Sequence, residues 1–240
     1  MTLSVLAPFD ETASAWRKTA EETARNLTAA ELAIFPDLCL DATELRSALF
    51  KAYSEPELSG SLLATDVFGL ARHLFELNYD LYAGRYESAG RTLRFLWELA
   101  FRSHLADTEQ PGLTIDEKVA WLEQRKPRPD WSTCVAPRIL TLFATGDPTE
   151  VTARFKTIWD RLNQFAHPSG PWRFSTVEES GRFAWPHFDA NLCRQLLADV
   201  NEVVALVWLL VLHQFPKAQG TFADPALVFN SFPVLKTLLD

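Results

Sequence analysis

An arginine and a histidine lie close together in residues 147–170, where their side chains could act on a phosphate. Arg161 and His167 are separated by five residues. A guanidinium can hold two phosphate oxygens and stabilise the negative charge that develops on them. An imidazole that titrates near neutral pH can accept a proton from an attacking hydroxyl or donate one to a leaving oxygen. Such a pair could promote attack of a hydroxyl group on an adjacent phosphate, and this chemistry needs no metal or other cofactor.

The spacing of this pair is not distinctive by itself. Arg182 and His187 have a similar spacing, and with five His residues in 240 a chance match is expected. The second pair spans Pro186, which an uninterrupted helix would not accommodate. The context therefore favours Arg161 and His167. A structural alternative stays open, in which Arg161 pairs with an acid or a carbonyl and His167 only ends a helix.

The pair lies at the end of a predicted helix. Asp147 is a suitable N-cap, Pro148 suits the first helical position, and Pro168 disfavours helical backbone at His167. Between them a continuous apolar stripe recurs at helical spacing, formed by Val151, Phe155, Ile158, Leu162 and Phe165. On an ideal helix, residues six apart point about 120° apart. A break at Pro168 or a second subunit must therefore bring Arg161 and His167 together.

Two earlier helices are predicted to position this one. Residues 65–82 and 86–106 are expected to form an antiparallel pair, because the turn between them is short and Gly84 suits a left-handed cap. The second helix carries a narrow charged seam at i, i+3 and i, i+4 spacing, formed by Glu87, Arg91, Arg94, Glu98 and Arg102. Arg94 and Glu98 are candidates to support a site, and a salt network without a catalytic role is the alternative.

The order of these features resembles that of HEPN-superfamily helical domains. The similar parts are the turn and helix AGRYESAGRTLRFLWE and the later helix end RLNQFAHPS. The resemblance covers residues 65–215, and is closest to a bacterial branch in which the motif His is followed by Pro-Ser or Gly-Ser. It implies an all-α bundle, a homodimer whose Arg and His line a shared cleft, and metal-independent RNA cleavage in the active members. It assigns the catalytic roles to Arg161 and His167.

The sequence departs from that pattern at one position. Active members carry a polar residue directly after the Arg, whereas this chain has Leu162 there. Asn163, four residues before His167, is the candidate to replace it. Two functions stay open. One is a metal-independent ribonuclease or toxin-type stress or phage-defence protein, with RNA as substrate and an antitoxin or other protein as partner. The other is a noncatalytic interaction module or dimer scaffold with a vestigial motif.

The composition is that of a globular protein with enough residues for one large domain or two small ones, and we expect a single helical domain over residues 1–240. The chain is 48% hydrophobic and 22% charged, and the periodicity predicts an all-α bundle of about seven to eight helices. Alternating aromatic residues predict one small β-hairpin over residues 172–185. A first helix is expected to end before Pro36, and a second to span residues 41–53. The turn-forming segment 54–61 is the candidate boundary between an N-terminal appendage, residues 1–60, and the core.

Charge and cysteine content argue against several classes of function, although a local basic patch stays open. The net charge of −8 gives no basic footprint for nonspecific duplex binding. Three scattered Cys residues without a CxxC motif argue against a disulfide framework or a thiolate zinc site. The N-terminal residues lack a basic secretory n-region, and the apolar run 203–215 is shorter than the roughly twenty residues of a membrane span. A cytoplasmic protein without a membrane partner is expected. The apolar helix expected over residues 187–215 also favours a homodimer.

Overall fold

The computed structural model describes residues 7–124, 148–166 and 188–222. These residues form eight α-helices and one short 3-10 helix and contain no strand, which confirms the all-α class. The hairpin predicted over residues 172–185 lies outside the described ranges. The elements are α1 (Ala7–Asn26), α2 (Ala29–Ala52), α3 (Glu55–Ser59), α4 (Leu62–Tyr82), α5 (Tyr86–Glu109), α6 (Ile115–Gln124), α8 (Pro148–Ala166), α9 (Ala190–Gln214) and η3 (Pro216–Thr221).

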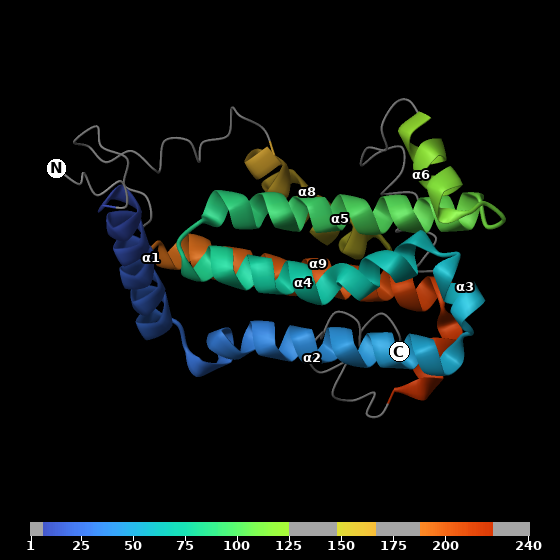
Figure 1. Ribbon diagram of the computed structural model, residues 1–240, viewed down its shortest axis with the longest axis horizontal. Coiled ribbons are helices and arrows are strands. Elements are labelled where there is room, and N and C mark those ends of the chain that lie inside the picture. The colour runs from blue at the N-terminus through green and yellow to red at the C-terminus, as the bar shows by residue number, and fades with distance from the viewer. Residues whose placement is uncertain (1–6, 125–147, 167–187, 223–240) are drawn as a thin grey trace.

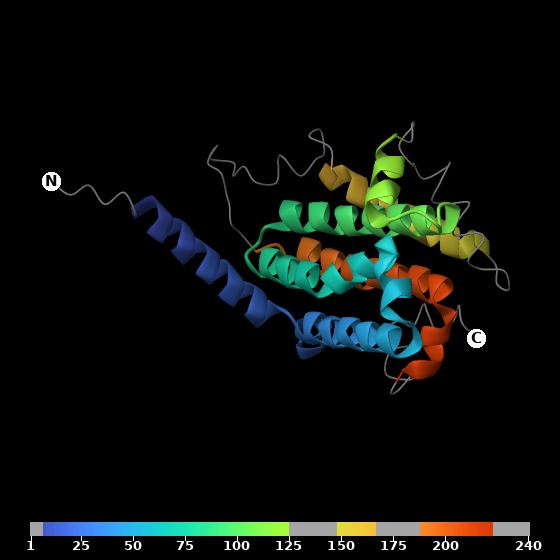
Figure 2. The same ribbon diagram turned by 45° about the vertical axis from the view of Figure 1, so that its right-hand side comes forward.

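The long helices α5 and α9 form the centre of the bundle. Helix α4 packs against α5, α9 and α2, and α8 packs against α5, as Figure 1 shows. One hydrophobic core extends from α2 to η3, with Trp97 of α5 and Trp208 of α9 fully buried within it. Helix α1 extends away from the bundle, most clearly in Figure 2.

The predicted antiparallel pair is confirmed as α4 and α5. Gly84, in the turn between them, has a φ of 70°. This left-handed conformation is the one that glycine adopts without steric cost. The short turn places the two helices side by side (Figure 1) and so fixes the charged seam of α5 relative to α4.

The predicted helix boundaries before residue 53 were wrong. Helix α1 ends at Asn26, and α2 begins at Ala29 and continues through Pro36 to Ala52. A reciprocal capping box sets this start: Glu31 N–H donates to Thr28 Oγ1 at 3.2 Å, and Thr28 N–H donates to the Glu31 carboxylate at 2.6 Å. Phe35 and Leu38 on either side of Pro36 are buried in the core. This packing offsets the hydrogen bond that proline removes from a helix.

The segment predicted as a linker, residues 54–61, contains the short helix α3. The carboxylate of Glu57 accepts hydrogen bonds from the N–H and the Oγ of Ser54, each at 2.7 Å. Leu58 of α3 is buried in the same hydrophobic core as the side chains of α2, α4, α5 and α9. From Leu27 onward, the candidate appendage therefore shares its packing with the rest of the bundle.

Helix α9 begins slightly later than predicted. The carboxylate of Asp189 caps it by accepting hydrogen bonds from the N–H groups of Asn191 and Leu192, each at 3.0 Å. Its apolar residues are covered by α2, α4 and α5, so their abundance is explained within one chain and gives no separate support for a dimer. Among the described helices, α9 alone is long and apolar enough to cross a membrane, but 78% of its most apolar stretch is buried inside the protein.

Candidate functional site

Arg161 of α8 forms a two-point ion pair with Asp199 of α9. Its Nε donates to one carboxylate oxygen of Asp199 at 2.9 Å, and one terminal amino group donates to the other oxygen. Asp199 is fully buried, whereas 27% of the Arg161 side chain remains exposed. The fork-like geometry uses two of the three guanidinium nitrogens. No hydrogen bond joins the remaining nitrogen, Nη1, to another residue within the described ranges.

Asn163 lies in a separate polar cluster with the charged seam of α5. Its side-chain oxygen accepts a hydrogen bond from Nε of Arg94 at 2.8 Å. A terminal amino group of Arg94 pairs with Glu98 at 2.6 Å. The guanidinium also lies over the ring of Trp159, with 3.5 Å between Cζ and the ring centroid. Arg94 is thus held by an amide, a carboxylate and an aromatic face.

The structure brings together some of the predicted site residues and separates others. Arg94, Glu98 and Asn163 meet at the α5–α8 interface. Arg161 and Asn163 are two residues apart, about 200° around an ideal helix, so Arg161 points to α9 while Asn163 points to α5. His167 lies outside the described residues, one position beyond the end of α8 at Ala166.

The end of α8 is also held by close contact with α5. Arg91 donates from Nε to the backbone oxygen of Phe165 at 3.2 Å and pairs with Glu87. Beside it, a Cβ added at Gly90 would lie only 2.3 Å from the Phe165 ring. The absence of a side chain at Gly90 therefore lets α5 approach the last turn of α8 closely. The position of Arg161 is set by contacts on both sides of its helix.

Burial dominates the electrostatics of both arginine clusters. Burial raises the pKa of the Asp199 carboxyl, and the hydrogen bond and charge of Arg161 oppose this rise. Burial lowers the pKa of Arg94, and the charge of Glu98 opposes this change. A buried charge that loses its partner is strongly destabilising. Arg161 and Arg94 therefore have structural roles whatever chemistry they perform.

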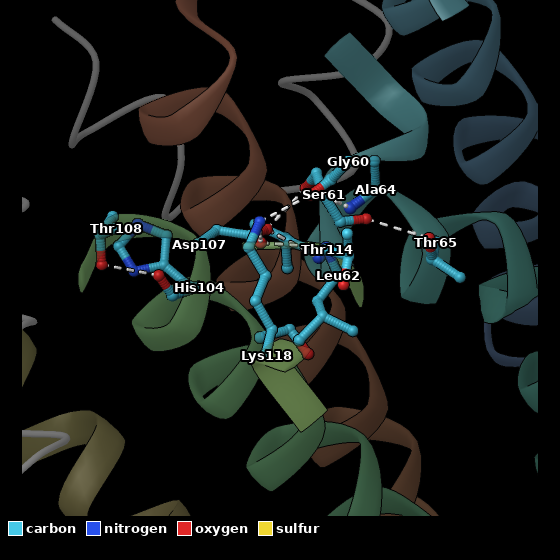
Figure 3. Close-up of polar contacts among 12 residues, drawn as sticks. Gly60, Ser61, Leu62, Ala64, Thr65, His104, Asp107, Thr108, Thr114 and Lys118 are labelled. Carbon is cyan, nitrogen blue, oxygen red and sulfur yellow. Dashed lines mark hydrogen bonds and ion pairs between the residues drawn. The ribbon is translucent and has the colours of Figure 1, made fainter. Parts of the chain in front are cut away.

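A third polar cluster, around Asp107 at the end of α5, is fully satisfied within the protein. Its two carboxylate oxygens accept hydrogen bonds from Ser61 Oγ at 2.6 Å and from the N–H groups of Leu62 and Leu63 at 3.0 Å. Lys118 of α6 donates to Asp107 at 2.9 Å and to the backbone oxygen of Gly60 (Figure 3). Asp107 thus caps the first turn of α4 from another helix. These contacts assign the cluster a structural role.

The described residues offer no convincing metal site. His73 and Glu76 on α4 contact each other, with 3.2 Å between Nδ1 and Oε2. No group of three or more His, Cys, Asp or Glu side chains with metal-binding geometry occurs among the described residues. A His–Glu pair alone does not complete the coordination of a transition metal.

Asp199 is the residue that sequence reasoning missed. It lies on the same helical stripe as Leu192, Leu196 and Val203, all of which are buried. A carboxylate on a buried stripe requires a cation or several hydrogen-bond donors. The sequence therefore contained a signal for a buried partner, although it did not identify Arg161 as that partner.

Comparison with known proteins gives no match to a family model, to a curated protein or to a solved structure.

Proposed function

We propose that the protein is a metal-independent ribonuclease of the HEPN type, a toxin-like stress or phage-defence protein of the cytoplasm. The observation that supports this proposal is that the guanidinium of Arg161 is held in place and is still partly exposed. Asp199 fixes its guanidinium at two points, while 27% of the side chain remains exposed near the end of α8. His167 follows six residues later in the sequence. A catalytic group held in place before substrate arrives loses little freedom on binding.

The proposed reaction divides the work between the two side chains. The 2′-oxygen forms a bond to the adjacent phosphorus, and the bond from phosphorus to the 5′-oxygen breaks. His167 takes the 2′-OH proton or supplies a proton to the leaving 5′-oxygen, and water exchanges the other proton. An amino group of Arg161 donates to a phosphate oxygen and stabilises the added charge. The products are a 2′,3′-cyclic phosphate and a 5′-hydroxyl.

A second candidate function is a noncatalytic helical interaction module. It is favoured by the same ion pair, because the buried carboxylate of Asp199 neutralises Arg161 and weakens its attraction for phosphate. Asn163 is also engaged, since it accepts a hydrogen bond from Arg94. In this alternative, Arg161 and Asn163 fix α8 to the bundle, and the arginine–histidine motif has no substrate.

The two candidates are separated by variants that preserve the fold. His167→Ala should abolish RNA cleavage with little change in melting temperature. Arg161→Ala alone is a poor test, because it leaves Asp199 buried without its cation. The double variant Arg161→Met, Asp199→Leu replaces the ion pair by apolar groups. It should restore stability without restoring cleavage. Arg182→Ala, at the other arginine–histidine match, is the control and should remain active.

The result that favours the interaction module is equally specific. Cleavage by the purified protein that persists in both His167→Ala and the double variant would exclude these residues from catalysis. Absence of any RNA cleavage by the folded wild-type protein would also favour the interaction module.

A further inference from the structure

The outward side of α4 exposes large aromatic side chains. Phe75 and Tyr79, one turn apart, are 66% and 54% exposed. Next to them, exposed Phe95 of α5 lies beside His73, with ring centroids 5.7 Å apart. On the other flank, exposed Phe50 of α2 stacks on Phe68 of α4, with 5.1 Å between the ring centroids. We call the surface formed by these five aromatic residues the α4 face: Phe50, Phe68, Phe75, Tyr79 and Phe95. Grouped exposed aromatics mark an interaction surface more often than scattered ones do.

The residues along the crest of the α4 face are arranged symmetrically. Gly69, Arg72, Glu76 and Tyr79 follow one another at intervals of three, four and three residues, so their midpoint is Leu74. This spacing keeps them on one side of the helix. Arg72 and Glu76 are exposed and form an ion pair, with 3.0 Å between Nε and Oε1. A Cβ added at Gly69 would meet nothing within 4 Å, so the surface is open at that position.

We propose that the α4 face is a two-fold interface with a second copy of this chain, the two α4 helices running antiparallel. A two-fold axis at the level of Leu74 relates the two antiparallel helices. It brings a residue that precedes Leu74 in one copy opposite the residue that follows Leu74 by the same number of positions in the other copy. Arg72 then faces Glu76 of the second copy, in both directions. Gly69 faces Tyr79 of the second copy, where the open surface accepts a large ring. The two Phe75 rings, one residue from the axis, come together on one flank.

Charge complementarity identifies the occupant as a second copy. The crest carries one cation and one anion at equal distances from its midpoint. An antiparallel copy of the same helix therefore places opposite charges together twice, whereas a parallel copy places like charges together. The exposed aromatic rings on both flanks supply the apolar surface that such a contact needs.

This interface lies on the opposite side of α5 from α8. Arg94, which contacts α8, and Ser103, which contacts Asp66 of α4, are nine residues apart on α5. Nine residues turn a helix through about 900°, which is two full turns and a half, so these side chains point to opposite sides of α5. The proposed dimer therefore leaves each α8 on the outside. It differs from the shared-cleft dimer that the family resemblance implies, and it does not rest on the proposed function.

The test is the oligomeric state of charge-reversal variants. Sedimentation of the wild-type chain at about 20 µM should give a dimer. Arg72→Glu alone places Glu opposite Glu across the axis twice, and Glu76→Arg alone places Arg opposite Arg. Each single variant should therefore dissociate with a Kd raised about tenfold or more. An equimolar mixture of the two should form a heterodimer, because both cross-axis pairs are then opposite in charge.

The mixture distinguishes contacts between chains from contacts within one. The like charges within each variant helix remain in the mixture, so recovery of the dimer can come only from pairs across the axis. Phe75→Ser should also yield monomers. Val119→Ser, an exposed apolar residue on α6, is the matched control and should leave the dimer intact. A wild-type monomer, or a dimer that persists in both charge reversals, would overturn the proposal. So would a mixture that stays monomeric although each variant has a wild-type circular dichroism spectrum.

Discussion

Asp199, fully buried on α9, holds the guanidinium of Arg161 through both carboxylate oxygens. This contact joins the one motif that suggests chemistry to the longest helix of the core. It gives Arg161 a fixed position, and it also makes the folded state depend on Arg161. An exposed catalytic arginine would be expected to contribute little to stability. Arg161 does not fit that expectation, so stability and activity must be measured together.

Asp199→Asn should lower the free energy of unfolding by about 3 kcal/mol, because the neutral amide leaves Arg161 without its counter-charge. Arg161→Ala should have an effect of similar size for the converse reason. The double variant Arg161→Met, Asp199→Leu should lie close to the wild type. Urea unfolding of the four proteins gives these values. Single variants that unfold like the wild type would show that the ion pair contributes little.

Gly90→Ala should destabilise the protein, although alanine favours helix formation. Its methyl group would meet the Phe165 ring, and relieving that overlap should cost about 1–3 kcal/mol. Gly112→Ala, in the exposed turn after α5, is the control, because its methyl group meets nothing within 4 Å and the φ of Gly112 is not positive. There the change should stabilise the protein by about 0.4–1 kcal/mol, because alanine restricts the unfolded chain. Thermal melting compares the two, and equal shifts would contradict the close α5–α8 contact.

Lys118→Met should destabilise the fold by roughly 3 kcal/mol, since it removes the cation from a buried carboxylate. The Gly60 carbonyl would also lose its donor. Lys156→Met removes the cation of an exposed i, i+4 pair with Asp160 and should change stability by less than about 0.5 kcal/mol. Urea unfolding of both variants tests the contrast. A Lys118→Met protein as stable as Lys156→Met would show that the cluster at Asp107 does not depend on its ion pair.

Asp66 should make stability fall as the pH rises from about 4 to 6. Burial raises the pKa of its carboxyl from 3.8 to about 6, while a hydrogen bond from Ser103 opposes this rise. The folded state thus binds the Asp66 proton more tightly than the unfolded state. The stability that this proton contributes is complete below the pKa of Asp66 in the unfolded chain and is lost above its pKa in the folded protein. Asp66→Asn cannot ionise and should gain stability relative to the wild type across this range. Urea unfolding at several pH values gives the comparison, and parallel curves would contradict the raised pKa.

The sequence predicted those parts of the fold that depend on local signals. Gly84 and the short turn around it predicted the α4–α5 pair, and Pro148 predicted the start of α8. Pro36 misled the prediction, because proline usually ends a helix. Here the capping box at Thr28 starts α2 earlier, and core packing carries it through the proline.

The candidate site was predictable only in part, because its contacts join residues far apart in sequence. The i, i+4 rule predicted the pair of Arg94 and Glu98, which the structure contains. No local rule relates Arg94 to Asn163 or Arg161 to Asp199, since their meeting depends on how α5, α8 and α9 pack. Periodicity identifies which face of a helix is buried, but not which buried charge meets which partner.

The most direct test of the proposed ribonuclease follows the fate of one RNA bond in EDTA. The substrate is an RNA oligonucleotide that the protein cleaves, compared with the same oligonucleotide carrying one 2′-deoxy nucleotide at the scissile position. Because the 2′-OH is the proposed nucleophile, the all-RNA substrate should yield a 2′,3′-cyclic phosphate and a 5′-hydroxyl. The modified substrate should resist cleavage at that position alone. Cleavage of the deoxy position, 5′-phosphate products or loss of activity in EDTA would contradict the mechanism.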